Sequence, residues 1–245
     1  MSEITIVPAG LRDCAVSWPD YAPVDVTPEE LLPRALEREV PFWAEGAATP
    51  DAVTDWAQRQ AAALVPFQLD AQGWPLHPAG RTGLTGRNLG RWGENVAADP
   101  IVIAGTGSDR RILLGTRDDI HQEAIPGGMV DTHTGETAPA ALVRELREET
   151  GVDLRDHQPV ILGTGLVDDW RQTDHAWVAS TFALYVLPAT VAATAADDAL
   201  DTTWYPAGSM AALESAIAAA GRTLYAAHRP LIARALAGAA LITAA

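Results

Sequence analysis

Apolar positions in the second half of the chain recur at two different spacings. Short apolar runs bounded by Gly, Pro or Asp predict strands at residues 160–163, 176–186 and 202–205. A longer run at residues 101–117 is divided by a Gly/Ser/Asp turn, which predicts a hairpin. Helical spacing predicts helices at residues 138–150, 209–220 and 224–239. Strands and helices in this order predict a mixed α/β sandwich.

The first part of the chain has no pattern of this length. Five prolines between positions 23 and 50 interrupt it, and the clearest helical spacing there covers residues 51–63. Residues 78–100 are rich in glycine and contain three arginines, which predicts a long ordered loop. We therefore expect an N-terminal extension or cap region at residues 1–85 and a main domain at residues 86–245.

The charge balance of the chain limits its partners. The 245 residues carry a formal net charge of −15, whereas nucleic acids and anionic lipid surfaces attract surfaces rich in Lys and Arg. We therefore expect a small-molecule substrate, with no nucleic acid and no membrane as partner. The single cysteine, Cys14, and an N-terminus without a basic and apolar leader favour a cytoplasmic location. The sequence leaves the oligomeric state open.

The stretch GETAPAALVRELREETG at residues 135–151 gathers acidic side chains on one predicted helix. With successive residues about 100° apart, three carboxylates share an arc of about 100°: Glu145, Glu148 and Glu149. Leu142 and Leu146 lie beside this arc, toward a core. The wheel places Arg144 and Arg147 elsewhere. Like charges four residues apart repel, so the acids are either a solvated face or the hard oxygen ligands of Mg²⁺ or Mn²⁺.

The residues around this helix resemble the signature of the Nudix hydrolase family. That signature is Gly, five residues, Glu, seven residues, then Arg-Glu-apolar-x-Glu-Glu-x-Gly-apolar. Here Glu136 is followed by seven residues and then by RELREETGV at residues 144–152. Seven residues separate Gly128 from Glu136, which we interpret as a two-residue insertion in the loop. The resemblance implies a Nudix α/β/α sandwich with a mixed sheet and, here, an N-terminal extension.

The same resemblance implies roles for individual residues. The glutamates at 145, 148 and 149 would bind divalent metal, Mg²⁺ or alternatively Mn²⁺, and act in catalysis. The backbone carbonyl of Gly127 would add a ligand, and Glu136 and Arg144 would brace the loop against the helix. Asp198, next to Asp197, matches an acidic pair that supplies a further catalytic carboxylate; its alternative is an exposed loop acid.

Further segments resemble one subfamily, the ADP-ribose pyrophosphatases of mitochondrial type. This group is related to the cytoplasmic ligand-binding domain of an ADP-ribose-gated TRP cation channel, and its members hydrolyse ADP-ribose to AMP and ribose 5-phosphate. The matching segments are spread along both parts of the chain: WPDYAPVDVTP, GRTGL, LGRWG, NVAADP, IPGGMVD, GLVDDWRQTDHAW and LYAAH. The resemblance therefore implies ADP-ribose as the substrate.

Five positions are candidates for binding that substrate: Asp169, Arg171, Leu224, Tyr225 and Arg91. Asp169 and Arg171 match ligand-contacting residues; a carboxylate accepts hydrogen bonds from ribose hydroxyls, and Arg binds phosphate or ribose oxygens. Their alternative is a structural ion pair. Leu224 and Tyr225 match positions that line the ligand site, and a half-buried core tyrosine is the alternative. Arg91 is the candidate among the three loop arginines, which also shape glycine-rich loops.

Two other functions remain open from the sequence. An ADP-ribose sensor without turnover would resemble the channel domain, but such sensors can lose the acids of the signature, and this chain keeps them. A Nudix pyrophosphatase acting on another nucleoside diphosphate derivative, such as NADH or a nucleotide sugar, would keep the same helix. A substrate panel separates these alternatives.

Overall fold

The computed structural model describes residues 5–196 and 199–242 of the chain. These residues divide into two compact units by their internal contacts. The first unit contains the residues up to Val96 together with Gly165–Ala179, and the second contains Ala97–Thr164 and Ser180 onward. The segment 165–179 thus belongs to the first unit although it follows the Nudix-like helix in sequence.

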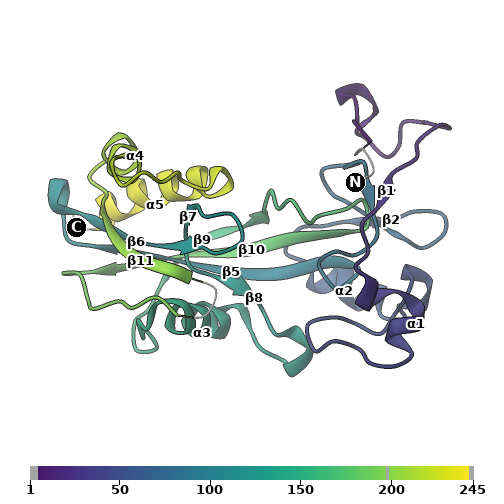
Figure 1. Cartoon of the computed structure of the whole chain (residues 1–245), viewed down its shortest axis with the longest axis horizontal. Helices are drawn as coiled ribbons and strands as arrows, with labels where there is room; N and C mark the ends of the chain where they lie inside the picture. Colours follow the sequence, from purple (N-terminus) through teal and green to yellow (C-terminus); the bar gives the residue numbers. More distant parts are fainter. Residues whose placement is uncertain (1–4, 197–198, 243–245) are drawn as a thin grey trace. The chain divides into compact units, whose positions relative to one another are not determined.

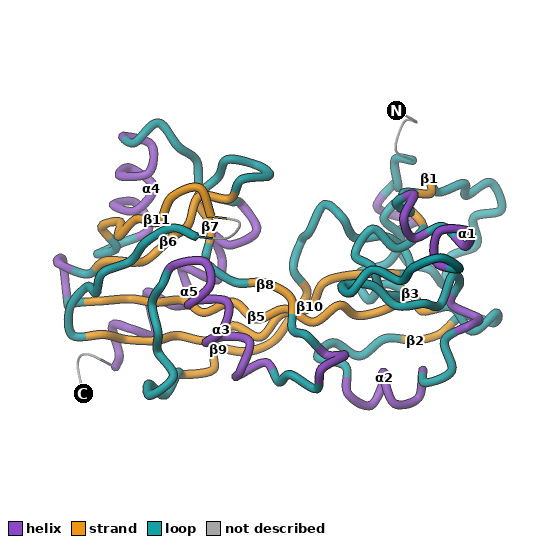
Figure 2. The backbone as a smooth tube through the Cα atoms, turned by 60° about the horizontal axis from the view of Figure 1, so that its bottom comes forward, coloured by secondary structure: helices purple, strands orange, loops and turns teal. Residues whose placement is uncertain are grey.

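The first unit consists mostly of loops and turns, which Figure 2 shows in teal. Its regular elements are short because prolines and glycines interrupt the chain. They are α1 (Pro33–Leu36), α2 (Trp56–Ala62), β1 (Val24–Asp25), β2 (Gln68–Leu69), β3 (Pro75–Leu76) and β4 (Leu84–Thr85). Strand β1 pairs with β4 in parallel, and β2 pairs with β3 in antiparallel orientation.

The second unit is built around a mixed sheet of seven strands in which β11, β6, β5, β10 and β9 are neighbours in that order. Short β7 pairs with β6, and short β8 pairs with β5. The strands are β5 (Gly93–Ala104), β6 (Arg111–Arg117), β7 (Glu123–Ala124), β8 (Gly128–Met129), β9 (Val160–Leu166), β10 (Ala176–Leu187) and β11 (Ala199–Pro206). The boundary between the two units lies within β5, β9 and β10.

Helices cover both faces of this sheet within the second unit. Figure 1 shows α3 (Ala138–Thr150) on one face and α4 (Met210–Ala219) with α5 (Arg229–Ile242) on the other. Neighbouring residues of β6 alternate between the two cores: Leu113 packs with Leu146 of α3, whereas Leu114 packs with Leu213 of α4. The predicted α/β sandwich is confirmed, and central strands buried on both faces account for the continuous apolar runs.

Several predicted elements agree closely with the structure. The helix expected at residues 138–150 is α3, and the hairpin expected at 101–117 is formed by the end of β5 and by β6. Ser209 caps α4, because its side chain accepts a hydrogen bond from Ala212 N–H. Local spacing and end signals were sufficient for these elements.

Three predicted boundaries were wrong. Residues 93–100 belong to β5 and not to a loop, because residues 97 and 98 pair with β8. The last helix begins at Arg229, not at 224, because Pro230 suits the first turn of a helix but not its interior. The helix expected at 51–63 is divided: a 3-10 turn at Pro50–Ala52 precedes α2, and Val53 between them is extended.

Candidate functional site

Helix α3 carries the acidic residues, and its ends and buried face explain its position. Pro139 lies in the first turn, where its missing N–H breaks no helical hydrogen bond. Gly151 follows the last turn with a φ of 69°, a conformation that glycine adopts readily. Leu142 and Leu146 are fully buried and therefore fix the rotation of the helix. The three glutamates lie beside this buried stripe.

Two of these glutamates lie against the glycine pair Gly127–Gly128. Gly127 N–H donates a hydrogen bond to Glu149 Oε2 at 3.2 Å. The Glu145 carboxylate lies so close to Gly128 that a Cβ there would be 2.6 Å from Glu145 Oε1. The loop and the helix thus bring Gly127, Glu145 and Glu149 to one place.

The third glutamate, Glu148, is held by Arg144. Arg144 Nη1 lies 3.0 Å from Glu148 Oε2 and 2.8 Å from Glu145 Oε1. The expectation that Arg144 points away from the acidic face is therefore wrong. Arg144 is four positions before Glu148, so the wheel itself puts the two only about 40° apart, and the long arginine side chain also reaches Glu145. Arg147 contributes less, with 3.9 Å between its Nη2 and Glu148 Oε1.

Arg144 also braces the loop that precedes the helix. Its Nε and Nη2 donate to Glu136 Oε1 and Oε2 at 2.7 and 2.9 Å, and Nη2 donates to Met129 O at 2.9 Å. Asp131 N–H donates to Glu136 Oε2 at 2.8 Å. The bracing role expected for Glu136 and Arg144 is confirmed. The longer loop contains a 3-10 turn at Thr132–Thr134, and the helix keeps its register.

Burial raises the pKa of Glu145 to about 7, and the nearby Arg144 only partly opposes this rise. Hydrogen bonds from Arg144 lower the pKa of Glu136. A divalent cation beside Glu145 would favour its ionised form. Within the described part of the chain, no three His, Cys, Asp or Glu side chains are already grouped as metal ligands. The carboxylates at the glycine pair are nonetheless hard oxygen donors, so they fit Mg²⁺ or Mn²⁺ by their chemistry.

Asp99 on β5 is a buried acid that sequence reasoning missed. Ser180 on β10 donates a short hydrogen bond to its Oδ2, and burial raises the pKa of Asp99 to about 6. A Cβ on Gly127 would lie 2.7 Å from Asp99 Oδ1 and 2.6 Å from Ala98 O. Residues Ala98 and Asp99 of β5 therefore lie directly against Gly127. The signal in the sequence was an acid next to Pro100 at the head of an apolar run.

Asp169 and Arg171 lie in the first unit, on a tight turn between β9 and β10. Arg171 Nε and Nη2 donate to the two carboxylate oxygens of Asp169 at 2.9 and 2.7 Å. Arg171 N–H also donates to Asp169 Oδ1 at 2.9 Å, which closes the turn. Asp169 is buried, whereas the Arg171 side chain is about one-third exposed. The two residues therefore form the structural ion pair that was the alternative to ligand binding. The Arg171 guanidinium is nonetheless partly exposed to solvent.

The next three residues anchor this turn inside the first unit. Gln172 Oε1 lies 3.1 Å from His77 Nε2, and Thr173 Oγ1 donates to Gly86 O at 2.6 Å. Asp174 accepts from Thr82 N–H and Oγ1 at 2.6 and 2.8 Å and from the Tyr21 hydroxyl at 2.5 Å. The N-terminal segments thus hold the Asp169–Arg171 turn in place.

The His77 anchor is expected to weaken in acid. Ala79 N–H donates to His77 Nδ1, so Nε2 carries the proton shared with Gln172, and burial lowers the pKa of the ring. The folded protein therefore keeps His77 neutral, while the unfolded chain gains a proton as the pH falls below about 6.5. The stability that the neutral, buried His77 ring contributes is therefore present above about pH 6.5 and is lost progressively below it.

We expect His77→Gln to reduce the free energy of unfolding by about 1–2 kcal/mol at pH 8, because it removes hydrogen bonds from a buried site. The difference between the two proteins should shrink at pH 5. Urea denaturation of both proteins at the two pH values measures it. A difference that grows toward low pH would contradict a neutral, buried His77.

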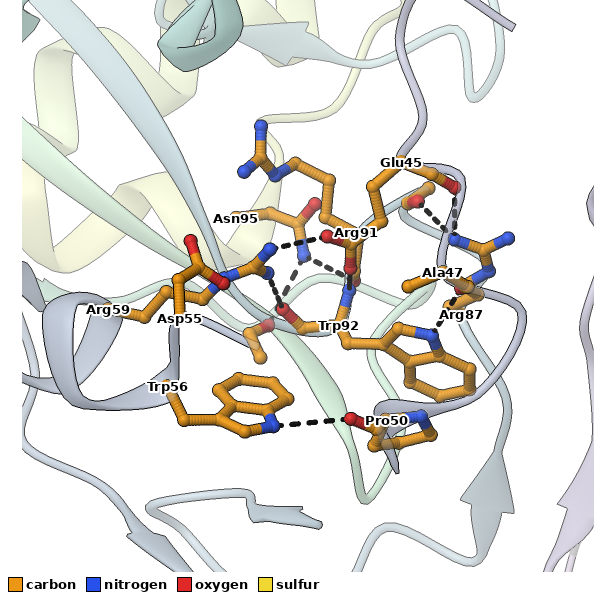
Figure 3. Close-up of polar contacts among 12 residues, drawn as sticks. Glu45, Ala47, Pro50, Asp55, Trp56, Arg59, Arg87, Arg91, Trp92 and Asn95 are labelled. Atoms are coloured by element: carbon orange, nitrogen blue, oxygen red, sulfur yellow. Dashed lines mark hydrogen bonds and ion pairs between the residues drawn. The ribbon is translucent and has the colours of Figure 1, made fainter. Parts of the chain in front are cut away.

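The three loop arginines of the first unit have different surroundings. Arg81 donates to four backbone carbonyls, and the fully buried Arg87 donates to the carbonyls of Glu45, Gly90 and Leu31. Both shape the loop. Arg91 is half-buried, its carbonyl accepts from Asn95 Nδ2, and Figure 3 shows its side chain extending away from the Trp92 indole. Arg91 therefore stays the candidate among the three.

Leu224 and Tyr225 lie in the second unit, between α4 and α5. Leu224 forms a parallel bridge with Glu123, and Tyr225 is half-buried. The Arg117 guanidinium lies 5.4 Å from the centre of the Tyr225 ring, and the His228 ring packs edge-on against it at 4.9 Å. Asp198 lies outside the described residues.

Comparison with protein families agrees with this arrangement. A model of the NUDIX domain matches residues 96–227, which is more than half of the chain. The chain belongs to the Nudix family. A second model, described as a NUDT9-like N-terminal domain, matches residues 7–93. The Nudix sandwich therefore follows an N-terminal region of a kind that also has its own family.

Three curated relatives locate the chain within the Nudix family. A putative nudix hydrolase 6 of Caenorhabditis elegans is 40% identical over 149 residues, which are 55% of this chain and 56% of the relative. The mitochondrial ADP-ribose pyrophosphatase of Rattus norvegicus is 33% identical over 201 residues, 66% of this chain and 55% of the relative. The match to a TRP cation channel, subfamily M member-like 2, of Nematostella vectensis is 32% over 203 residues, 68% of this chain and 13% of the channel.

The chain thus spans about half the length of the two enzyme relatives. It is homologous both to the mitochondrial ADP-ribose pyrophosphatase and to a segment that makes up 13% of the channel. In the described residues no helix of this Nudix protein combines the length and the apolar character needed to cross a membrane.

Proposed function

We propose that this Nudix protein is a Mg²⁺-dependent hydrolase that cleaves the pyrophosphate of ADP-ribose to AMP and ribose 5-phosphate. The observation that carries the proposal is the approach of two α3 carboxylates, Glu145 and Glu149, to the glycine pair Gly127–Gly128. The similarity to the mitochondrial ADP-ribose pyrophosphatase supports ADP-ribose as the substrate.

The candidate residues divide into two proposed roles, metal binding and substrate binding. The cation would be held by three glutamates and a main-chain carbonyl: Glu145, Glu148, Glu149 and Gly127 O. Arg144 forms ion pairs with Glu145 and Glu148 and keeps them in place. A bound divalent cation would neutralise charge on the diphosphate and lower the pKa of a water. Asp169 and Arg171 would bind ribose and phosphate oxygens, and Leu224, Tyr225 and Arg91 would line the substrate.

The reaction is a hydrolysis at phosphorus. The oxygen of a water molecule bonds to one phosphorus atom, the bond from that phosphorus to the bridging oxygen breaks, and a carboxylate accepts the proton from the water. We propose Asp198 as that carboxylate. No oxidant or further substrate is needed for this balance.

A non-catalytic ADP-ribose sensor is the second candidate, because the chain is also homologous to a TRP channel. A sensor has no need of hard oxygen ligands. This chain keeps all three glutamates, and one of them contacts the glycine loop directly. The arrangement therefore favours the enzyme.

The test is release of AMP from ADP-ribose with Mg²⁺, compared with NADH and a nucleotide sugar. We expect AMP formation fastest with ADP-ribose, abolished by EDTA and restored by excess Mg²⁺ or Mn²⁺. Faster cleavage of another diphosphate would support metal binding by the α3 glutamates but would contradict ADP-ribose as the substrate. Calorimetric binding of ADP-ribose without any cleavage would establish the sensor instead.

A further inference from the structure

A row of polar side chains crosses the second unit at the ends of three strands. In the register of the sheet, Asp201 on β11 is opposite Thr116 on β6, and Thr116 is opposite Glu123 on β7. Paired residues present their side chains on the same face of a sheet. The guanidinium of Arg222 spans this row: it donates to Glu123 Oε1 at 2.8 Å, to Asp201 Oδ2 at 2.9 Å and to Thr116 Oγ1.

Burying the Glu123 carboxylate at this position costs free energy. It is fully buried, and its Oε1 accepts from both Thr116 and Arg222, while its Oε2 has no hydrogen-bond partner among the described residues. Burying a carboxylate costs free energy, and its ion-pair partner Arg222, whose side chain is 30% exposed, offsets this cost only in part. Stability alone therefore does not account for this pair, whereas fixing the position of a neighbouring segment does.

The neighbouring segment is the one that carries Leu224 and Tyr225. Glu123 N–H donates to Thr223 O, and Tyr225 N–H donates to Glu123 O, both at 2.8 Å. Two residues further on, Ile125 N–H donates to His228 Nδ1 at 3.0 Å. The short stretch 123–125 and segment 222–228 are therefore joined by three main-chain amides and by the ion pair between buried Glu123 and partly exposed Arg222.

The same stretch leads directly into the metal-binding loop. Only Pro126 separates Ile125 from Gly127, whose N–H contacts Glu149. A displacement of segment 222–228 relative to residue 123 would thus change the position of Tyr225 relative to Gly127. Backbone bonds alone permit sliding and fraying at an isolated bridge, and the Glu123–Arg222 ion pair opposes this.

We propose that Glu123 and Arg222 are positioning residues that hold Tyr225 in register with the metal-binding loop. The proposal rests on the proposed function, since it assigns the substrate-lining role to Tyr225. Neither residue touches the reacting atoms in this scheme. Arg222 acts through Tyr225, and Glu123 acts through Arg222.

The decisive experiment is a double-mutant cycle between Arg222→Ala and Tyr225→Ala. Arg222→Ala should raise KM for ADP-ribose roughly 5- to 50-fold, with a smaller change in kcat. In the Tyr225→Ala background, Arg222→Ala should leave KM within about twofold, because the residue through which it acts is already absent. Arg229→Ala is the matched control, because the Arg229 side chain is 59% exposed and forms its ion pair with Glu214 on α4.

Two outcomes would overturn the proposal. An equal rise of KM in both backgrounds would show that Arg222 contacts the substrate itself. A lower Tm for Arg222→Ala with an unchanged KM would reduce the pair to a stabilising contact. Glu123→Gln, which keeps the shape and loses the charge, should raise KM less than Arg222→Ala does.

We call the hold of Glu123 and Arg222 on segment 222–228 the clamp. Amide hydrogen exchange tests this clamp without any substrate. Exchange at Tyr225 and Glu123 should be at least tenfold faster in Arg222→Ala than in Arg229→Ala. Unchanged exchange would refute the clamp. If the wild-type protein hydrolyses no ADP-ribose but this exchange difference is present, the proposed function fails while the clamp stands.

Discussion

Replacing Glu149 with glutamine is expected to lower kcat for ADP-ribose hydrolysis by about 10²- to 10³-fold. The amide oxygen of glutamine still accepts the hydrogen bond from Gly127 N–H, so the loop and the helix keep their contact. What disappears is the negative charge, which is worth several kcal/mol when a divalent cation must be held against a diphosphate. The fold should therefore persist while turnover is lost.

The measurement is kcat for AMP release over a series of Mg²⁺ concentrations, together with Tm. Glu214→Gln on α4 makes the same chemical change on a helix that faces the opposite side of the sheet, and it should leave both quantities unaltered. Glu148→Gln should also lose most of its turnover. Near-normal turnover in both Glu149→Gln and Glu148→Gln would contradict the proposal that these glutamates bind the metal.

Adding a single methyl group at Gly128 is the second change with a large expected effect. The new Cβ would lie 2.6 to 2.7 Å from the carboxylate atoms of Glu145, closer than any real contact permits. The end of a glutamate side chain moves at little energetic cost, so Gly128→Ala should fold with a Tm close to that of the wild type. The carboxylate, however, moves away from the glycine pair. We expect turnover to fall by about 10- to 100-fold and the requirement for Mg²⁺ to rise.

Gly127→Ala provides the comparison within the same pair. Its Cβ would lie 2.6 Å from Ala98 O and 3.0 Å from Asp99 Cα, and the residue has a φ of 150°. Because backbone atoms cannot move aside as a side chain does, this change should cost about 1–3 kcal/mol of unfolding free energy. Thermal unfolding and kinetics of the two variants separate the effects. A destabilised Gly128→Ala, or a stable Gly127→Ala, would contradict this geometry.

Sequence reasoning worked best where the signal was local. The bounds of α3 came from helical spacing, from Pro139 in the first turn and from Gly151 after the last one, all within about fifteen residues. The glutamates at 145, 148 and 149 were identified there because spacing on a helix determines which side chains share a face. The bracing of Glu136 by Arg144 followed from the family resemblance and is present in the structure.

It failed where distant contacts decided the outcome. Residues 93–100 look like a loop in sequence, yet pairing with the segment around 128 makes them a strand. Arg144 was placed away from the acids although it is the i,i+4 neighbour of Glu148, and its side chain contacts Glu145 as well. Asp99 and Glu123 gave little signal, since a single acid in an apolar stretch reveals neither its burial nor its partners.

The sequence by itself determined the acidic helix, the family and the main strands and helices of the sandwich, because these depend on spacing between near neighbours. Only the tertiary structure decided which glutamates meet the glycine pair and which is held by Arg144. It alone placed Arg222 on Glu123, 99 residues away. Such contacts arise from packing a sheet between helices, and packing depends on the whole chain at once.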